Sequence, residues 1–241
     1  MIEQNTLLSG SEELGLKLDS KALNDFSLYK KLLLEWNKKF NLTAVTDDVE
    51  IDIKHFLDSL TVISLLPDKQ FLKVIDVGTG AGFPGIPIKI IKPDAELVLL
   101  DSLNKRLKFL DEVISQLKLE NIKTVHLRAE DAGKDVLYRA KYDVSISRAV
   151  ANLKVLSEYC LPLVKVNGLF IAMKGPNANN EISEAKAMIK ELGGEIVSVK
   201  KMTLPFSDME RNIVLVNKIR QTSTKYPRTS AELAKIHKKN K

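Results

Sequence analysis

The chain has 241 residues, of which 44% are hydrophobic, and its formal net charge is +6. This length supports one compact domain with an ordinary core, and no run of about 18 apolar residues is present that would span a membrane. Cys160 is the only cysteine, which excludes an internal disulfide and a cysteine-based metal cluster, so no metal site is expected. The N-terminus lacks a basic segment followed by an apolar one, and we therefore expect a cytoplasmic protein.

Two amphipathic helices are predicted before the first strand, and they make residues 1–69 an N-terminal helical cap. Asn41 lies in the loop between these helices, whereas His55 and Ser59 are four positions apart on one face of the second. We interpret these three residues as candidates for the border of a substrate cleft. Taken singly, residues of these types are more often structural than functional.

A glycine-rich loop follows the first predicted strand, where residues 73–85 read Lys-Val-Ile-Asp-Val-Gly-Thr-Gly-Ala-Gly-Phe-Pro-Gly. Asp76 lies near the end of the strand, and Gly78, Gly80 and Gly82 follow at a spacing of two. Glycine lets the backbone turn tightly and lets a ligand approach where a Cβ atom would collide. This arrangement is typical of a nucleotide-like ligand site.

Two ligand classes compete for this loop. A dinucleotide fingerprint requires Gly-x-Gly-x-x-Gly, and counting from Gly78 its last position is occupied by Phe83. The pattern Asp-x-Gly-x-Gly-x-Gly instead looks like the first motif of Rossmann-like methyltransferases that use S-adenosylmethionine (SAM). We expect Asp76 to engage the amino or sulfonium side of SAM through water or backbone groups. A glycine-rich turn that binds nothing is the alternative.

Further polar residues are expected at the same edge of the sheet. Asp101 ends the next apolar run, roughly 20 positions beyond the first glycine, where a carboxylate accepts hydrogen bonds from ribose hydroxyls. It is equally placed to cap the helix that Ser102 opens. Ala129 and Glu130 follow a later short strand and are expected to face the adenine ring, although a solvated acidic turn explains Glu130 as well.

Strands alternate with helices through the rest of the chain, and 196–202 and 212–216 form a closing hairpin. This order predicts an α/β fold of the Rossmann-like class I SAM methyltransferase type, with a seven-stranded, mostly parallel sheet and an antiparallel edge. Residues 70–218 would form this core. Arg148 stands at the carboxyl end of the fourth strand and is therefore aimed at the ligand.

Residues 219–241 are predicted to form a basic C-terminal tail. Glu232 is the one acidic residue among the last two dozen positions. The basic residues in and beside this tail are Lys218, Arg220, Lys225, Arg228, Lys235, Lys238, Lys239 and Lys241. Tails of this kind attach to phosphate backbones, and a solubilising extension is the alternative.

Five blocks of the chain, in this order, resemble the RsmG (GidB) family of bacterial small-subunit rRNA methyltransferases. They are Glu-Trp-Asn-Lys-Lys-Phe-Asn-Leu-Thr at 35–43, Lys-His-Phe-Leu-Asp-Ser at 54–59, Asp-Val-Gly-Thr-Gly-Ala-Gly-Phe-Pro-Gly at 76–85, Ser-Arg-Ala at 147–149 and Met-Lys-Gly at 173–175. The resemblance covers roughly residues 10–230 and includes Tyr-Pro-Arg at 226–228. Residues 229–241 depart from the proline- and lysine-rich ending of many members, which puts tail contacts in doubt.

The resemblance implies SAM-dependent methylation of nitrogen-7 of guanine 527 of 16S rRNA, in the loop beside the decoding site. It also implies the residues that surround SAM, to which the loop pattern adds Asp76 and Gly80. The implied residues are Gly78, Phe83, Asp101, Ser102, Leu103, Ala129, Glu130 and Arg148. The expected partner is 16S rRNA, within the small ribosomal subunit or its precursor, and the expected state is a monomer.

The site chemistry agrees with this target. Residues 147–151 read Ser-Arg-Ala-Val-Ala, which is not the Asn/Asp-Pro-Pro-aromatic motif of many methyltransferases that act on exocyclic amines. Cys160 lies on an apolar helix face and is not set as a nucleophile. Guanine nitrogen-7 carries a free lone pair, so an in-line transfer needs no general base and no conventional catalytic residue. Arg148 and Lys174 are candidates for positioning.

Phosphate contacts are predicted for five basic residues, namely Arg106, Lys174, Arg211, Lys225 and Arg228. Two other functions stay open on the sequence alone. A small-molecule SAM methyltransferase is disfavoured by the basic tail and the helical cap. A non-catalytic RNA- or ribosome-binding protein is disfavoured by the intact glycine loop and Asp101.

Overall fold

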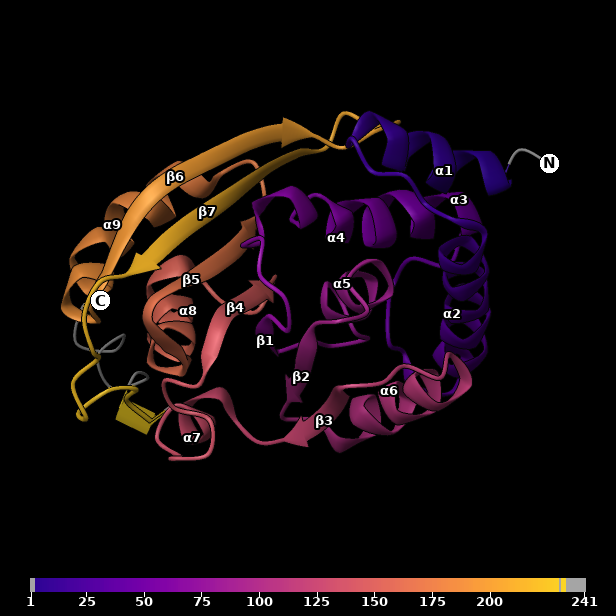
Figure 1. The fold of residues 1–241 in the computed structure, drawn as a ribbon. Helices are drawn as coiled ribbons and strands as arrows, with labels where there is room; N and C mark the ends of the chain where they lie inside the picture. Colours follow the sequence, from indigo (N-terminus) through magenta and orange to yellow (C-terminus); the bar gives the residue numbers. More distant parts are fainter. Residues whose placement is uncertain (1–2, 230, 233–241) are drawn as a thin grey trace.

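The computed structural model describes residues 3–229 and 231–232, and its centre is a seven-stranded sheet (Figure 1). The strand order is β3-β2-β1-β4-β5-β7-β6, in which β1 to β5 are parallel and β7 runs antiparallel between β5 and β6. The fold class predicted from the sequence, including the antiparallel edge, is confirmed. The strands are β1 (Lys73–Val77), β2 (Glu96–Asp101), β3 (Ile122–His126), β4 (Tyr142–Arg148), β5 (Val164–Lys174), β6 (Gly194–Thr203) and β7 (Glu210–Lys218).

Helices cover both faces of this sheet (Figure 1). The helices that precede or link the first strands are α1 (Glu3–Glu13), α2 (Ser20–Phe40), α3 (Asp48–Ile51), the π-helix η1 (Asp52–Leu57), α4 (Asp58–Leu60), η2 (Ile63–Leu65), α5 (Gly85–Ile91) and α6 (Asn104–Gln116). Those on the other side are α7 (Ala129–Ala132), α8 (Leu153–Cys160), η3 (Leu161–Leu163) and α9 (Ala178–Glu191). Each face buries its own hydrophobic cluster, as expected for a parallel sheet.

The helices before β1 pack directly on the glycine loop. The rings of Tyr29 and Phe56 stack with centroids 5.5 Å apart, and Tyr29 lies 5.4 Å from Phe83. The buried hydroxyl of Tyr29 donates to the carbonyl of Ala81. Aromatic contacts of this kind add about 0.5–1.5 kcal/mol each to the burial of their area. The helical cap and the sheet therefore share one core at the side of the loop.

The first part of the predicted tail is docked on the sheet domain. Arg228 binds the buried carboxylate of Glu158, with Nη2 2.6 Å from Oε2. Arg139 donates to the carbonyls of Thr222 and Tyr226 at 2.7 and 2.8 Å, and Tyr226 is buried. These contacts hold the chain against the sheet domain as far as Arg228. Four further basic residues of the tail, Lys235, Lys238, Lys239 and Lys241, lie outside the described residues.

No helix in the described part of the chain is both long enough and apolar enough to cross a membrane.

Candidate functional site

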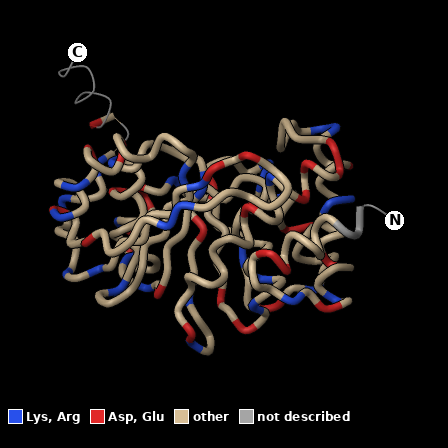
Figure 2. The backbone as a smooth tube through the Cα atoms, turned by 90° about the horizontal axis from the view of Figure 1, so that it is seen from above, with Lys and Arg blue, Asp and Glu red and all other residues tan. Residues whose placement is uncertain are grey.

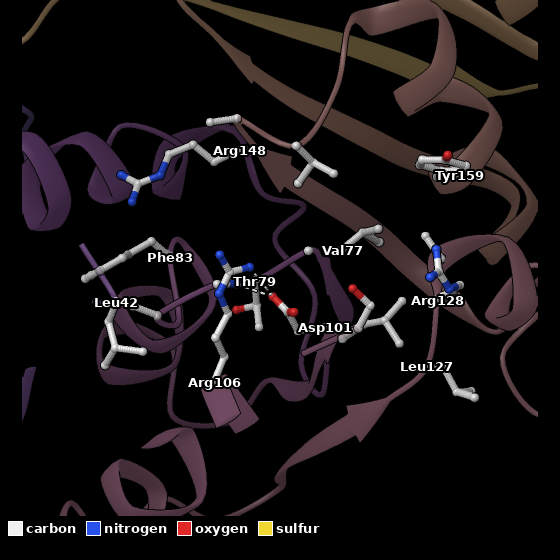
Figure 3. Close-up of a pocket in the computed structure, with 18 of the residues that line it drawn as sticks. Leu42, Val77, Thr79, Phe83, Asp101, Arg106, Leu127, Arg128, Arg148 and Tyr159 are labelled. Atoms are coloured by element: carbon white, nitrogen blue, oxygen red, sulfur yellow. Dashed lines mark hydrogen bonds and ion pairs between the residues drawn. The ribbon is translucent and has the colours of Figure 1, made fainter. Parts of the chain in front are cut away.

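A cavity of about 540 Å³ lies at the carboxyl ends of β1 to β4 (Figure 3). Open parallel sheets bind ligands at this edge, because the loops after the strands converge there. Eight of the ten residues predicted around SAM line the cavity. They are Gly78, Gly80, Phe83, Asp101, Ser102, Ala129, Glu130 and Arg148. The structure therefore brings together residues from four separate stretches of the sequence.

The glycine loop has a backbone that only glycine adopts freely. Gly78, Gly80 and Gly82 have φ angles of 70°, 62° and 99°. The amide groups of Gly78 and Thr79 donate to the carbonyl of Leu100 at 2.8 and 3.0 Å, which joins the loop to β2. These bonds fix the loop against the sheet, while Gly78, Thr79 and Gly80 line the cavity.

Asp76 acts beneath the loop rather than in the cavity. Its carboxylate is fully buried, and Oδ2 accepts hydrogen bonds from Thr79 Oγ1 at 2.7 Å and from the amide of Gly85 at 2.9 Å. Burial raises the pKa of Asp76 to about 6, although these two hydrogen bonds lower it in part. The position of Asp76 does not support the expected contact with the ligand, and the carboxylate instead shapes the loop.

Asp101 joins the loop to the following helix. Its side chain is buried, with Oδ2 2.9 Å from the amide of Gly80 and Oδ1 2.8 Å from the amide of Leu103. Arg106 Nη1 lies 3.3 Å from Oδ2, and Figure 3 shows the two side chains next to each other. Leu103, not Asp101, is the N-cap residue of α6, and its exposed side chain does not line the cavity. Asp101 thus holds a carboxylate at the cavity wall in a fixed orientation.

Arg148 crosses the cavity wall toward the helical cap. Its Nη1 lies 3.0 Å from Asp58 Oδ2 and 3.3 Å from the carbonyl of Lys54, and its Cζ lies 4.9 Å from the centroid of the Phe83 ring. Asp58 also accepts from Arg211 Nε, at 2.9 Å from Oδ1. One buried carboxylate therefore holds two guanidinium groups, one of which lines the cavity.

His55 is part of the same wall. Its ring stacks on Phe83 at 4.6 Å, and its Nε2 lies 2.7 Å from Thr43 Oγ1. Burial, and then the positive charge of Arg148, lower the pKa of His55 to about 4. The ring is therefore neutral at neutral pH. Ser59 is buried and donates to the carbonyl of His55, whereas Asn41 is the exposed left-handed C-cap of α2, and neither lines the cavity.

A family model described as rRNA small subunit methyltransferase G (GidB) matches residues 22–214 of the chain. The chain belongs to this family. It is 53% identical to the ribosomal RNA small subunit methyltransferase G of Acetivibrio thermocellus, over 95% of this chain and 94% of the relative. It is 49% identical to the protein of the same name from Clostridium tetani, over 95% of this chain and 96% of the relative. The family predicted from the five sequence blocks is confirmed.

Solved structures give the same fold at low sequence identity. The YcgJ protein from Bacillus subtilis is 12% identical with a TM-score of 0.54, over 69% of this chain and all of that chain. The TYW2 protein of M. jannaschii, solved in complex with AdoMet, is 14% identical with a TM-score of 0.50, over 63% of this chain and 72% of that chain. At this identity the likeness extends to the fold alone.

The five residues predicted to contact RNA phosphates all have carboxylate partners within the protein. The pairs are Arg106 with Asp101, Lys174 with Glu181, Arg211 with Asp58, Lys225 with Glu191 and Arg228 with Glu158. Only Arg106 and Lys225 keep more than a third of the side chain exposed. A phosphate contact by any of the other three would have to replace a partly buried ion pair.

Lys174 illustrates what such a pair does. Its Nζ lies 2.7 Å from the carboxylate of Glu181 and 2.7 Å from the carbonyl of Ala151. The same Glu181 carboxylate accepts from the amide of Leu153 at 2.7 Å. Lys174 is thus placed to position the loop between β4 and α8, which lines the cavity through Ala149. Its position does not favour a phosphate contact.

Sequence reasoning missed several residues of the cavity wall. Leu42 and Thr43 come from the loop after α2, and Tyr159 comes from α8. The first two lie inside a block that carries the family resemblance, which is the signal that identifies them. Tyr159 belongs to an amphipathic helix, and nothing in its local pattern separates it from a residue that packs on the core.

Proposed function

We propose that this protein transfers the methyl group of SAM to nitrogen-7 of guanine 527 in 16S rRNA. Membership of the rRNA small subunit methyltransferase G family supports the reaction type and the RNA substrate. The observation that carries the proposal is the cavity itself, where the glycine loop and Asp101 are joined by the hydrogen bond from Gly80. A cavity volume of about 540 Å³ is in the range of sites that bind small molecules such as SAM.

The residues present fit SAM on physical grounds. Gly78 and Gly80 offer backbone where no Cβ atom would obstruct a ligand. The Asp101 carboxylate would accept hydrogen bonds from ribose hydroxyls, and Ala129 and Glu130 would border the adenine. Arg148 would position the donor from the opposite wall. SAM would supply an electrophilic methyl group on its sulfonium.

The protein would act by orientation. Guanine nitrogen-7 is an acceptor without a proton, so no side chain has to remove one. Holding the nitrogen in line with the methyl group can lower the activation barrier by about 7–11 kcal/mol. His55 fits this scheme because its low pKa leaves it neutral and adds no charge beside a base that becomes cationic. Asp58 also limits the positive charge beside the base, because its carboxylate pairs with Arg148.

Transfer from radiolabelled SAM to three acceptor pools separates the candidate functions. The pools are small-subunit RNA from cells lacking the enzyme, large-subunit RNA and a small-molecule extract. We expect label in the small-subunit RNA alone. Label in the extract alone would favour a small-molecule methyltransferase. No SAM binding by calorimetry, together with no transfer to any pool, would favour a non-catalytic RNA-binding protein.

A further inference from the structure

The charge pattern of this chain does not by itself identify where RNA would dock. Figure 2 shows lysine and arginine interspersed with aspartate and glutamate over much of the backbone. All five predicted phosphate contacts bind carboxylates of the protein, and only Arg106, which binds Asp101, lines the cavity itself. RNA would instead dock where exposed basic residues lie close to the cavity and most of them form no ion pair with a carboxylate of the protein.

Two helix ends bring such cations to the cavity. Helix α2 ends at Phe40, and the following Leu42 and Thr43 line the cavity. Helix α6 begins at Asn104, directly after β2, and its Arg106 lines the same cavity. Trp36 of α2 packs against Phe109 of α6 with ring centroids 5.7 Å apart, so the two ends are held side by side.

These helix ends carry exposed basic residues that lack acidic partners. In the described part of the chain, no ion pair is formed by Lys38, Lys39, Lys105 or Lys108, and all four are exposed. The first turn of α6 holds no acidic residue. Cations at a helix N-terminus oppose the helix dipole by about 0.3–1 kcal/mol each. The placement of Lys105 in the first turn of α6 therefore costs helix stability, and an anionic partner would offset this cost, whereas the dipole favours Lys38 and Lys39 in the last turn of α2.

We propose that the phosphate backbone of the substrate RNA lies across this basic rim, which consists of Lys38, Lys39, Lys105, Arg106, Lys108 and Arg128. Arg128 belongs to it because it lines the cavity after β3 with a side chain that is 66% exposed, although its Nη1 also lies 4.0 Å from the carboxylate of Glu130. Leu103 and Val150, two exposed apolar side chains beside the cavity, are placed to contact bases. The inference rests on the proposed function, because it names the surface by which that site would meet its RNA.

A second basic hollow provides the competing location. It has a volume of about 630 Å³, lies at the opposite ends of the strands and is lined by Lys73, Lys123, Lys141 and Lys165. There Lys73 pairs with Glu96 at 3.0 Å, and Lys165 with Asp143 at 3.4 Å. The protein thus neutralises two of the four lysines at the hollow, and likewise Arg106 and Arg128 among the six residues of the basic rim. The rim is favoured because four of its cations form no ion pair in the described part of the chain and because it lies beside the glycine loop, whereas the hollow lies at the opposite edge of the sheet.

The test compares two double variants of the full chain that remove the same charge. They are Lys39→Gln with Lys105→Gln on the basic rim, and Lys123→Gln with Lys141→Gln at the opposite edge. Binding to small-subunit RNA from cells lacking the enzyme is measured over a range of salt concentrations, together with the KM for RNA and kcat. Each lost contact to a single-stranded phosphate lowers the slope of log K against log salt by about 0.7.

We expect the rim variant to lose about 1.4 from this slope and to raise the KM for RNA several-fold, with kcat unchanged at saturating RNA. The variant of the opposite edge should match the wild type. The inference is overturned if the rim variant keeps the wild-type slope, or if the opposite-edge variant loses it instead. Calorimetry with SAM and circular dichroism melting establish that each variant is folded. Failure of the wild type to methylate the RNA would count against the proposed function.

Discussion

Arg148 and Arg211 are bound to the same carboxylate, because Asp58 accepts from Arg148 at 3.0 Å and from Arg211 at 2.9 Å. Asp58 lies in the helical cap, whereas the two arginines lie on β4 and β7. The carboxylate is buried, and the side chains of Arg148 and Arg211 are only 15% and 19% exposed. The cap is therefore fastened to the sheet at the point where Arg148 enters the cavity.

The first prediction concerns this shared carboxylate. Asp58→Asn should weaken SAM binding by about tenfold, because Arg148 loses the charge that orients it. It should also lower the free energy of unfolding by about 2 kcal/mol, less than for a fully buried pair since both arginines are partly exposed. Calorimetry and urea denaturation measure these two effects.

A double-mutant cycle separates orientation from general damage. In an Arg148→Gln background, Asp58→Asn should have little further effect on SAM affinity, since the group that it orients is already gone. Additive losses of affinity would contradict a role for Asp58 through Arg148.

The second prediction concerns Asp101. Asp101→Asn keeps a hydrogen-bond acceptor for the amide of Gly80 but removes the charge, and hydrogen bonds to charged groups contribute about 1.5–3 kcal/mol. SAM affinity should fall by about 10- to 100-fold in calorimetry. Asp25→Asn, which breaks an exposed ion pair with Lys21, is the matched control and should leave SAM affinity unchanged. Equal affinities in the two variants would remove Asp101 from the site.

The third prediction concerns the packing of Gly85 against Leu99 and Asp76 beneath the glycine loop. A Cβ atom at Gly85 would lie 2.3 Å from Leu99 Cδ2 and 2.8 Å from Asp76 Oδ2, so Gly85→Ala must displace buried neighbours. It should lower the free energy of unfolding by about 1–3 kcal/mol and impair SAM binding. Gly175→Ala is the control, because no heavy atom lies within 4 Å of its added Cβ. Thermal unfolding of the two variants in parallel decides the matter, and equal melting temperatures would be inconsistent with this packing.

The fourth prediction concerns the pH dependence of stability. The folded-state pKa of His55 is about 4, below its ordinary value of 6.5, so folding favours the neutral ring. This contribution is present above about pH 6.5 and is lost as the pH falls toward 4, by about 3 kcal/mol. The pH dependence should be weaker in His55→Gln. Nuclear magnetic resonance titration of the ring provides the direct measurement, and a pKa near 6.5 would contradict the burial of this site.

Arg148 contributes to the same shift through its charge. Arg148→Gln should therefore raise the pKa of His55 in the same titration, even though the ring stays stacked on Phe83. An unchanged pKa would mean that the arginine does not lie beside the ring in solution.

The sequence predicted the sheet and much of the cavity because these depend on local patterns. The glycine loop, the alternation of strands and helices, and the acidic end of β2 each occupy one short stretch. The parallel fold then brings Gly80 and Asp101 to the same edge, and they form the hydrogen bond at 2.9 Å. Position along the chain and the rules of sheet topology were sufficient for this part of the site.

Other features depend on pairs that no local pattern reveals. Asp58 meets partners 90 and 153 positions away, and the sequence does not show that Arg211 would be engaged in this way. Lys174 and Arg228 are predicted from the sequence to contact RNA phosphates, yet each binds a carboxylate in the fold. Asp76 matched a ligand motif, but its side chain points beneath the loop, since Thr79 and Gly85 supply its hydrogen bonds.

The most direct test of the central claim is to locate the methyl group in the RNA. Small-subunit RNA from cells lacking the enzyme is incubated with the protein and SAM, and 7-methylguanosine is mapped by borohydride–aniline cleavage. We expect a single new cleavage, at guanine 527. Cleavage at another guanine would overturn the proposed target, and the absence of any methyl transfer by folded protein would contradict the account as a whole.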